Sequence, residues 1–381
     1  MQVYEQVEAY MKEVGLKYIK SPQDFITGLA IKTDKQYAQD MAQELNSRAE
    51  GAPSDNKAFY KLKNRSLDGS IHVSAAFDGG VFRHIGNMII DEKDMAGKDV
   101  LDLCCDCGIV TCFMARCYPD SSFTGVDIDE GAVENAKQLA ERLGVTNVEF
   151  VCCDVYELDL NKQFDYVTSF RSLLDAADKQ TKGLNFIGYR PEREESYKNA
   201  FLPFAEAASK HLKDGGSLIS VERYTGEYGW LGWMYALSEV GINPTEKCEA
   251  MRAQDISSVK EYSVTYAVKG DGKDVLETFN DVMSKQFKSG TGYDGAMAEF
   301  ALYYDSEGEI EFYDVKGKRN IHQFAFAKSK GGKGMYYDAS NDTRKIKYFN
   351  EKKEAAVRKD FEKKLGLYDR NVYIVKEYKC K

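Results

Sequence analysis

Short apolar strands alternate with amphipathic helices over residues 100–221, and this alternation limits the possible folds more than any other feature of the chain. The strand candidates are largely apolar and bounded by turn residues: 100–103, 123–126, 148–152, 165–170 and 217–221. Between them apolar residues recur at helical spacing, as over 132–143, where Gly144 follows as a helix stop. The pattern predicts an α/β fold with a parallel sheet, helices on both faces and a ligand beyond the carboxyl ends of the strands.

Two further regions flank this segment, and each has its own pattern. In residues 1–95 apolar side chains recur at helical spacing, which predicts a helical N-terminal region or lid. Residues 96–270 then hold the alternating domain, which two more strands at 243–251 and 261–270 complete. The order of helix and strand patterns in residues 271–381 predicts an α+β accessory domain, for acceptor binding or dimerisation. Its expected helices are 275–287 and 357–365, and its expected strands are 298–304, 308–315, 321–329 and 371–379.

The charge and the cysteine content argue against several classes of protein. The chain has 381 residues and a net charge of −9, which argues against general nucleic-acid binding. No run of about 18 apolar residues occurs and the N-terminal segment lacks a secretory apolar region, so we expect a cytoplasmic protein without a membrane partner. Most of the nine cysteines crowd into 104–117 and 152–153, whereas a disulfide framework would distribute them in pairs. Reduced thiols are therefore expected.

The segment DLCCDCG at 102–108 joins the first strand to the following helix, and its residues raise the question of what it binds. Glycine is favoured in such a turn because the backbone must approach a ligand closely. Only Gly108 is a glycine here, but Asp106 adopts left-handed backbone angles more readily than most residues, and Cys104 is small. One interpretation is therefore a working ligand loop with unusual residues.

Two other interpretations of this loop are weaker. A nicotinamide site needs Gly-x-Gly-x-x-Gly at the turn, and only Gly108 is present. Cys104 and Cys107 form a Cys-x-x-Cys pair, but a zinc ribbon needs a second such pair at suitable spacing, and Cys117 belongs to the apolar stripe of the next helix. We therefore expect no metal, and we interpret these cysteines as small core residues.

Five segments in order resemble the motifs of the class I S-adenosylmethionine-dependent methyltransferases, which have a Rossmann-like seven-stranded sheet. The first runs from Asp102 to Gly108, where the family has Asp-x-Gly-x-Gly-x-Gly and this chain has Cys104 and Asp106 at the first two glycine positions. The others are FTGVDIDEGAVENAK, VEFVCCDVYEL, FDYVTSFRSL and HLKDGGSLISVE. Five motifs in order over about 170 residues are far more specific than any one of them.

The resemblance implies S-adenosyl-L-methionine as the cofactor and S-adenosylhomocysteine as the product. It assigns Asp127, at the end of the second strand, to the ribose hydroxyls, and Asp154 to the adenine amino group. The Asp106 carboxylate could meet the amino group of the cofactor. The cofactor-binding residues that we expect are Asp102, Cys104, Asp106, Gly108, Asp127, Ile128, Asp154, Val155 and Ser169.

The acceptor side is less specific. Methyl transfer is an in-line displacement that needs alignment, and it needs a base only where the acceptor must lose a proton. Arginines after the fourth strand could bind a carboxylate, although Arg190 and Arg193 also fit a solvated charged face. The candidates for catalysis are Arg171, His84 and Tyr224.

Aromatic residues follow the fifth strand and have two interpretations. Glu222, Tyr224, Tyr228, Trp230 and Trp233 could form the wall of an acceptor pocket, and core packing of the next helix is the alternative. The Asn-Pro-Pro-Tyr motif of amine methylation is absent, with SFRS in its place.

These patterns favour an enzyme that methylates oxygen, as a carboxylate or hydroxyl, on a small molecule or peptide in bacterial natural-product or metabolite tailoring. The extra domain suggests an acceptor larger than a bare metabolite, and a homodimer is possible. The alternative is a catalytically weak methyltransferase fold that serves as a binding or scaffold protein.

Overall fold

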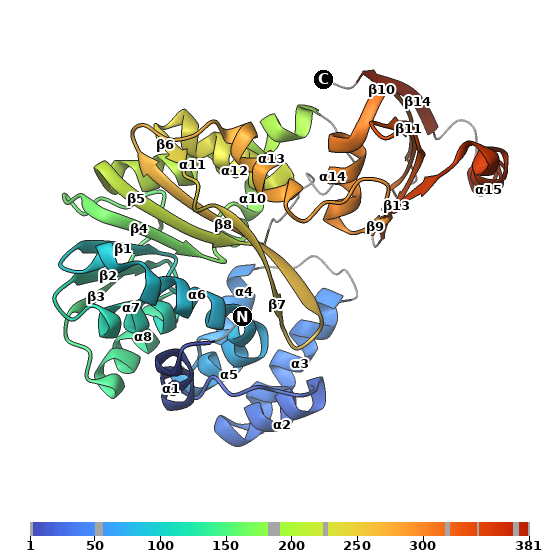
Figure 1. Ribbon diagram of the computed structural model, residues 1–381. Helices are drawn as coiled ribbons and strands as arrows, with labels where there is room; N and C mark the ends of the chain where they lie inside the picture. The colour runs from blue at the N-terminus through green and yellow to red at the C-terminus, as the bar shows by residue number, and fades with distance from the viewer. Residues whose placement is uncertain are drawn as a thin grey trace. The chain divides into compact units, whose positions relative to one another are not determined.

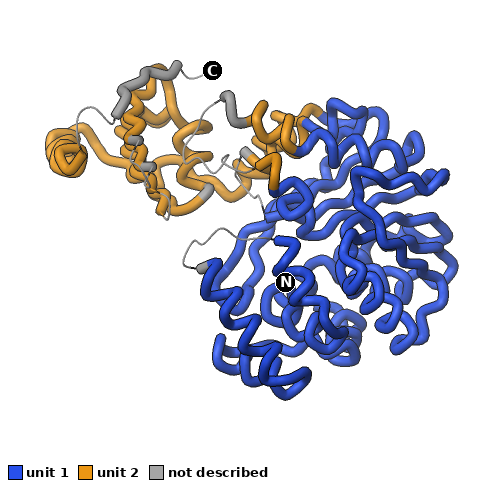
Figure 2. The backbone as a smooth tube through the Cα atoms, turned by 180° about the vertical axis from the view of Figure 1, so that it is seen from behind, with its two compact units in different colours: residues 1–178, 201–223, 236–273 blue, residues 179–200, 224–235, 274–381 orange. Residues whose placement is uncertain are grey.

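The computed structural model describes residues 3–49, 56–181, 191–223, 228–316, 321–340, 343–368 and 373–379. The chain forms two compact units, each of which is discontinuous in sequence (Figure 2). Unit 1 comprises residues 1–178, 201–223 and 236–273, and unit 2 comprises residues 179–200, 224–235 and 274–381. The segments that follow the fourth and fifth strands of unit 1 therefore belong to unit 2.

The centre of unit 1 is a mixed sheet with a parallel majority (Figure 1). Its strands are β1 (Asp99–Leu103), β2 (Ser122–Asp127), β3 (Val148–Cys152), β4 (Phe164–Phe170), β5 (Leu212–Glu222), β6 (Ile242–Pro244), β7 (Glu249–Gln254) and β8 (Val259–Lys269). The order is β3-β2-β1-β4-β5-β8-β6, with β7 paired to β8 off this path. β1 to β5 are parallel and β8 is antiparallel to β5, so the α/β expectation is confirmed, with one strand more than the expected seven.

The order of the strands fixes where a ligand can bind. From β1 the chain moves outward to β2 and β3, then returns to place β4 on the other side of β1. The carboxyl ends of β1 and β4 are thus neighbours, with Leu103 opposite Ser169. This is the switch point at which open α/β sheets bind their ligands.

Helices make up most of the described N-terminal region of unit 1 and also connect the strands of its sheet. The N-terminal helices are α1 (Glu5–Val14), α2 (Pro22–Lys32), α3 (Lys35–Ala49), α4 (Asn56–Lys63), α5 (Leu67–Phe77) and α6 (Gly79–Asp91), and a 3-10 turn, η1 (Lys93–Met95), precedes β1. Those between and after the strands are α7 (Ile109–Cys117), α8 (Glu130–Leu143), α9 (Leu173–Ala176), α10 (Asp178–Thr181), α11 (Pro191–His211) and α12 (Tyr228–Glu239). The helical N-terminal region that periodicity predicted is therefore present.

The β7–β8 hairpin contacts the N-terminal helices α5 and α6. A Cβ atom at Gly80 in α6 would lie 1.9 Å from the Gln254 carbonyl oxygen, so only glycine fits there. Next to it, the Ile256 N–H donates to the Ala76 carbonyl at 2.9 Å. One core of apolar side chains joins α1, α5 and α6 to α7 and to the strands, including Val7, Phe82, Phe113 and Val264.

Unit 2 contains an antiparallel sheet of order β14-β10-β11-β12-β13-β9. Its elements beyond residue 273 are α13 (Val275–Ser284), β9 (Tyr293–Asp294), α14 (Ala296–Asp305), β10 (Ser306–Lys316), β11 (Ile321–Ser329), β12 (Gly334–Ser340), β13 (Arg344–Phe349), η2 (Glu351–Lys353), α15 (Glu354–Leu365) and β14 (Tyr373–Lys379). The expected strand at 298–304 is wrong, because that segment is helix α14. Residues 297–302 of α14 are all buried, and a short run that is buried all round has no periodicity to separate strand from helix.

None of the helices among the described residues has the length and apolar content needed to cross a bilayer.

Candidate functional site

The loop between β1 and α7 holds its backbone in the left-handed region at three alternating positions. The φ angle is 57° at Cys104, 50° at Asp106 and 74° at Gly108, the three positions where the family pattern has glycine. This conformation costs a non-glycine residue ~1–2 kcal/mol, so neighbouring contacts must hold it. The Cys105 N–H donates to the Val126 carbonyl at 2.9 Å, and the Gly108 N–H donates to the Cys105 carbonyl at 3.0 Å.

Asp102 supports this loop from inside the sheet. Its side chain is 2% exposed, and its two carboxylate oxygens accept hydrogen bonds from the hydroxyls of Thr111 at 2.6 Å and Thr168 at 2.9 Å. Burial raises the pKa of Asp102 to about 6. Asp102 therefore ties α7 and β4 to β1, and hydroxyl groups of the protein already bind both of its oxygens.

Asp127 lies at the carboxyl end of β2, beside the same loop. Its Oδ2 accepts from the Asp106 N–H at 2.8 Å, and its Oδ1 accepts from the Asp129 N–H at 2.9 Å. Burial, and then the Asp106 carboxylate, raise the pKa of Asp127 to about 6. Each oxygen keeps a lone pair, so ligand hydroxyls can still donate to this fixed carboxylate.

Asp106 forms a buried ion pair with Lys63 of α4. The lysine side chain is 6% exposed, and although burial alone lowers its pKa, the Asp106 carboxylate raises the pKa of Lys63 above its usual value. The other carboxylate oxygen, Oδ1, is buried and accepts no hydrogen bond from any described residue. Leaving a buried acceptor unpaired is costly, so Oδ1 is available to a donor group on a ligand.

The loops after β2 and β3 add an acid and uncovered apolar side chains to this edge. The Cys153 N–H donates to the Asp127 carbonyl at 2.9 Å, which places the start of the following loop beside Asp127. In that loop the Tyr156 N–H donates to Asp154 Oδ1 at 3.0 Å, and Val155 is buried. Ile128 is 64% exposed and Tyr156 is 37% exposed, unusual values for apolar side chains. The edge can therefore hold a flat, partly apolar ring.

Ser169, at the end of β4, is bound within the protein. Its hydroxyl donates to Glu222 Oε1 at 2.9 Å and lies 2.7 Å from the Ser172 hydroxyl. The Leu173 N–H donates to Glu222 Oε2 at 3.3 Å. Burial raises the pKa of Glu222 to about 8. At neutral pH Glu222 is therefore largely protonated, and it links the carboxyl ends of β4 and β5.

The short helix α4 contacts the segment after β4 as well as the loop after β1. The Tyr60 hydroxyl donates to Asp175 Oδ2 at 2.5 Å, and the Asn56 side chain donates to Asp175 Oδ1 at 3.1 Å. Together with Lys63, these bonds place α4 over the switch point. Sequence reasoning missed Tyr60, Lys63 and Asp175. Nothing in AFYKLKNR distinguishes Lys63 from the exposed Lys61, because only the fold shows which lysine meets a carboxylate.

Of the three catalytic candidates, the structure describes Arg171 and His84. Arg171, itself at a φ of 61°, forms an ion pair with Asp78 and donates to the Phe77 carbonyl at 3.2 Å, so its guanidinium is bound to the α5–α6 junction. His84 lies half-buried on α6, where burial lowers its pKa, and no described hydrogen bond links it to the loop. Tyr224 lies outside the described residues.

Of the other acceptor-side candidates, some are buried in the core and others lie outside the described residues. Trp230 and Trp233 are 0% and 1% exposed in unit 2, and the Trp230 ring lies 5.6 Å from that of Phe279, which is core packing. Arg190 and the side chains of Arg193 and Tyr228 are outside what the structure describes. The cysteines of the loop are packed inside: Cys105 and Cys107 are buried, and burial raises the pKa of both thiols.

Comparison with known proteins finds methyltransferases that are similar to the part of the chain that carries this edge. Residues 100–185 match the family model described as a methyltransferase domain. The malonyl-[acyl-carrier protein] O-methyltransferase of Acetivibrio thermocellus is 35% identical over 92 residues, which are 23% of this chain and 31% of that protein. The ribosomal protein uL3 glutamine methyltransferase of Xylella fastidiosa is 30% identical over 135 residues, 34% of this chain and 43% of that protein.

Among solved structures, the N-methyltransferase NodS of Bradyrhizobium japonicum in complex with S-adenosylhomocysteine aligns with a TM-score of 0.39 and 12% identity, over 56% of this chain and 99% of that one. The chain spans about a third of the length of the first curated relatives it matches. The matched segment begins at β1 and runs past β4, and so contains the loop, Asp127 and Asp154. Residues 100–185 therefore match a methyltransferase domain, in agreement with the resemblance of their motifs to the class I S-adenosylmethionine-dependent methyltransferases.

Proposed function

We propose that the protein is an S-adenosylmethionine-dependent methyltransferase whose cofactor binds at the carboxyl ends of β1, β2 and β3. The observation that carries this proposal is the left-handed backbone at Cys104, Asp106 and Gly108, held beside a carboxylate, Asp127, that backbone N–H groups fix in place. Backbone strain at a ligand loop is retained where the surrounding structure enforces it for function.

The described residues fit the chemistry of this cofactor. Asp106 Oδ1 is a buried acceptor suited to the ammonium group of the methionine part, and the adjacent Lys63 ammonium suits its carboxylate. Asp127 suits the ribose hydroxyls, and Asp154 with the uncovered Ile128 suits the adenine. When bound, S-adenosylmethionine supplies an electrophilic methyl group, and the protein contributes alignment and exclusion of water.

We further propose that the acceptor is an oxygen, with a carboxylate favoured over a hydroxyl. Glu222, the buried acid at the end of β5, is largely protonated at neutral pH and is not a ready proton acceptor. Arg171 and His84 are not joined to the loop by any described hydrogen bond. A carboxylate needs no base, because it is already ionised. Relatives named as malonyl-[acyl-carrier protein] O-methyltransferases support the same atom type.

The first test is isothermal titration of the full chain with S-adenosylmethionine and with S-adenosylhomocysteine. We expect micromolar binding, and we expect Asp127→Ala to weaken it by about tenfold or more, since one charged partner of two hydroxyls is lost. Asp120→Ala, which removes an exposed carboxylate of unit 1, is the matched control and should bind normally. Equal affinities of the two variants would remove Asp127 from the ribose site.

The rival proposal is a scaffold that has lost turnover because two loop glycines are replaced. Incubation with labelled cofactor and mixtures of carboxylate metabolites and peptides, followed by mass spectrometry, separates the two. Accumulation of a methyl-ester product supports the enzyme, whereas tight cofactor binding without a product in any mixture supports the scaffold.

We also propose that the N-terminal helices act as the lid and that residues 271–381 bind the acceptor or form a dimer.

A further inference from the structure

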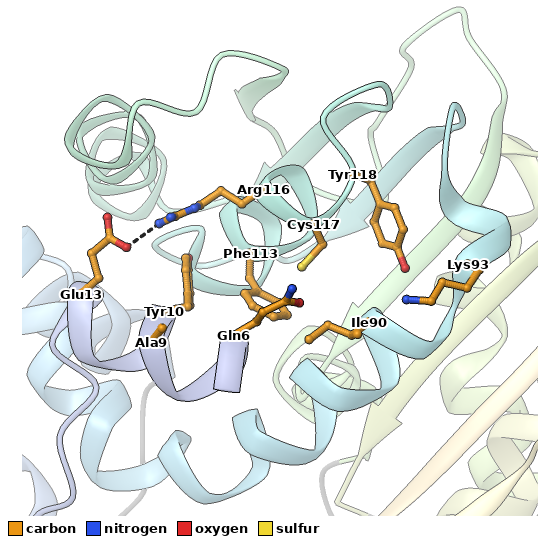
Figure 3. A pocket seen from close by; sticks show the side chains of 10 residues that line it. All are labelled: Gln6, Ala9, Tyr10, Glu13, Ile90, Lys93, Phe113, Arg116, Cys117 and Tyr118. Carbon is orange, nitrogen blue, oxygen red and sulfur yellow. Dashed lines mark hydrogen bonds and ion pairs between the residues drawn. The ribbon is translucent and has the colours of Figure 1, made fainter. Parts of the chain in front are cut away.

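A cavity of unit 1 lies on the outer side of α7, among residues of α1, α6 and η1. Its volume is about 410 Å³, within the range of small-molecule sites. None of the proposed cofactor residues lines it. Figure 3 shows its side chains converging from these elements on one space.

The floor of the cavity is apolar. Phe113 and Tyr10 are buried with ring centroids 4.9 Å apart, and Ile90 and Tyr118 continue the surface. The Tyr10 hydroxyl donates to the Ile109 carbonyl at 2.7 Å, and the Tyr118 hydroxyl donates to the Glu92 carbonyl at 2.8 Å. Because backbone carbonyls occupy both hydroxyls, neither tyrosine offers a free hydroxyl donor to a ligand, and an apolar body fits such a floor.

The rim carries an excess of positive charge. Arg116 pairs with Glu13 at 2.6 Å, and its guanidinium lies 5.8 Å from the centre of the Tyr10 ring. Lys93 is exposed, and its ammonium forms no hydrogen bond or ion pair with the rest of the described chain. Figure 3 shows that ammonium directed toward the space beside Ile90 and Tyr118. Two cations and one carboxylate therefore leave one positive charge beside an apolar floor.

We propose that this cavity binds a small molecule with a flat apolar body and one anionic group, a carboxylate, sulfonate or phosphate. The body lies on Phe113 and Ile90, and the anion pairs with Lys93 while Arg116 stays on Glu13. This binding needs neither the cofactor nor methyl transfer, so it stands apart from the function proposed for the loop.

Fluorescence titration with 8-anilinonaphthalene-1-sulfonate, an aromatic sulfonate, tests the proposal on the full chain. Ala9→Trp fills the cavity from an exposed position of α1, and Lys93→Glu reverses the unpaired charge. We expect each variant to bind the probe about tenfold more weakly, or worse. Lys137→Glu makes the same charge change on the exposed side of α8 and should bind as the unchanged protein does. Equal affinity in all four proteins would overturn the proposal.

Cys117 supplies a second readout at the cavity itself. Its thiol lines the space and is half-buried, whereas Cys152 is exposed elsewhere on unit 1. N-ethylmaleimide labelling, followed peptide by peptide by mass spectrometry, compares the two. At a probe concentration of ~10 times Kd, labelling of Cys117 should slow about tenfold, because only free protein reacts there. Labelling of Cys152 should not change. Unprotected Cys117 at saturating probe would place the probe elsewhere and end the proposal.

Discussion

Single residues determine the charge pattern of the proposed cofactor loop, and Lys63 is the one most open to test. We expect Lys63→Met to weaken S-adenosylmethionine binding about tenfold or more, because Asp106 loses its partner and the cofactor carboxylate loses a cation. Binding of 5′-methylthioadenosine, which lacks the amino-acid end, should hardly change. Titration of both ligands measures the difference. Lys61→Met, the exposed neighbour, serves as control. An equal loss for both ligands would indicate a general structural role for Lys63.

The buried acid Glu222 should make the free energy of unfolding depend on pH. Its pKa rises from 4.5 to about 8 on burial, so between these values the folded protein binds more protons than the unfolded chain. The free energy of unfolding contributed by this group therefore falls as pH rises through that range and is constant below it. Urea unfolding of Glu222→Gln, which stays neutral, should show a shallower fall between about pH 5 and pH 8. Asp102 and Asp127, with pKa values near 6, retain part of the slope. A slope identical to that of the unchanged protein would contradict the assignment.

At the scale of elements, the sequence predicted where the strands end. It placed Asp102, Asp127 and Asp154 at or next to the carboxyl ends of β1, β2 and β3, because strand ends follow from apolar runs and turn residues. The same reasoning could not find Tyr60 or Lys63, since their partners lie tens of residues away in sequence. It also took α14 for a strand, because a buried apolar run looks alike in both states.

The strain in the loop 104–108 can be measured. Glycine adopts a φ of 57° freely, so Cys104→Gly should raise the free energy of unfolding by ~0.5–1 kcal/mol, the strain released less the entropy that glycine adds to the unfolded chain. Cys105→Gly, at a buried position without positive φ, should instead lower it by ~1 kcal/mol or more. Denaturant titration of both variants measures the sign of each change in the free energy of unfolding. Destabilisation by Cys104→Gly would mean that packing of the thiol outweighs the backbone.

At the scale of the whole molecule, the division of the chain into discontinuous units carries a prediction. The two tryptophans of the protein, Trp230 and Trp233, belong to unit 2 although they follow β5, and Trp230 packs on Phe279. Removing residues 274–381 takes away Phe279 and therefore uncovers the Trp230 ring. We expect the truncated protein to show red-shifted tryptophan emission and greater aggregation, because buried aromatic surface becomes exposed. An emission maximum equal to that of the full chain would show that the tryptophans are buried without the C-terminal part.

The left-handed angles at Cys104 and Asp106 also bear on how relatives of this chain are found. A search that requires three glycines after the first strand passes over it, since one glycine remains while the torsion angles of all three positions persist. Scanning structures for alternating positive φ between a strand and a helix, beside an acid on the adjacent strand, would retrieve such chains whatever letters they carry.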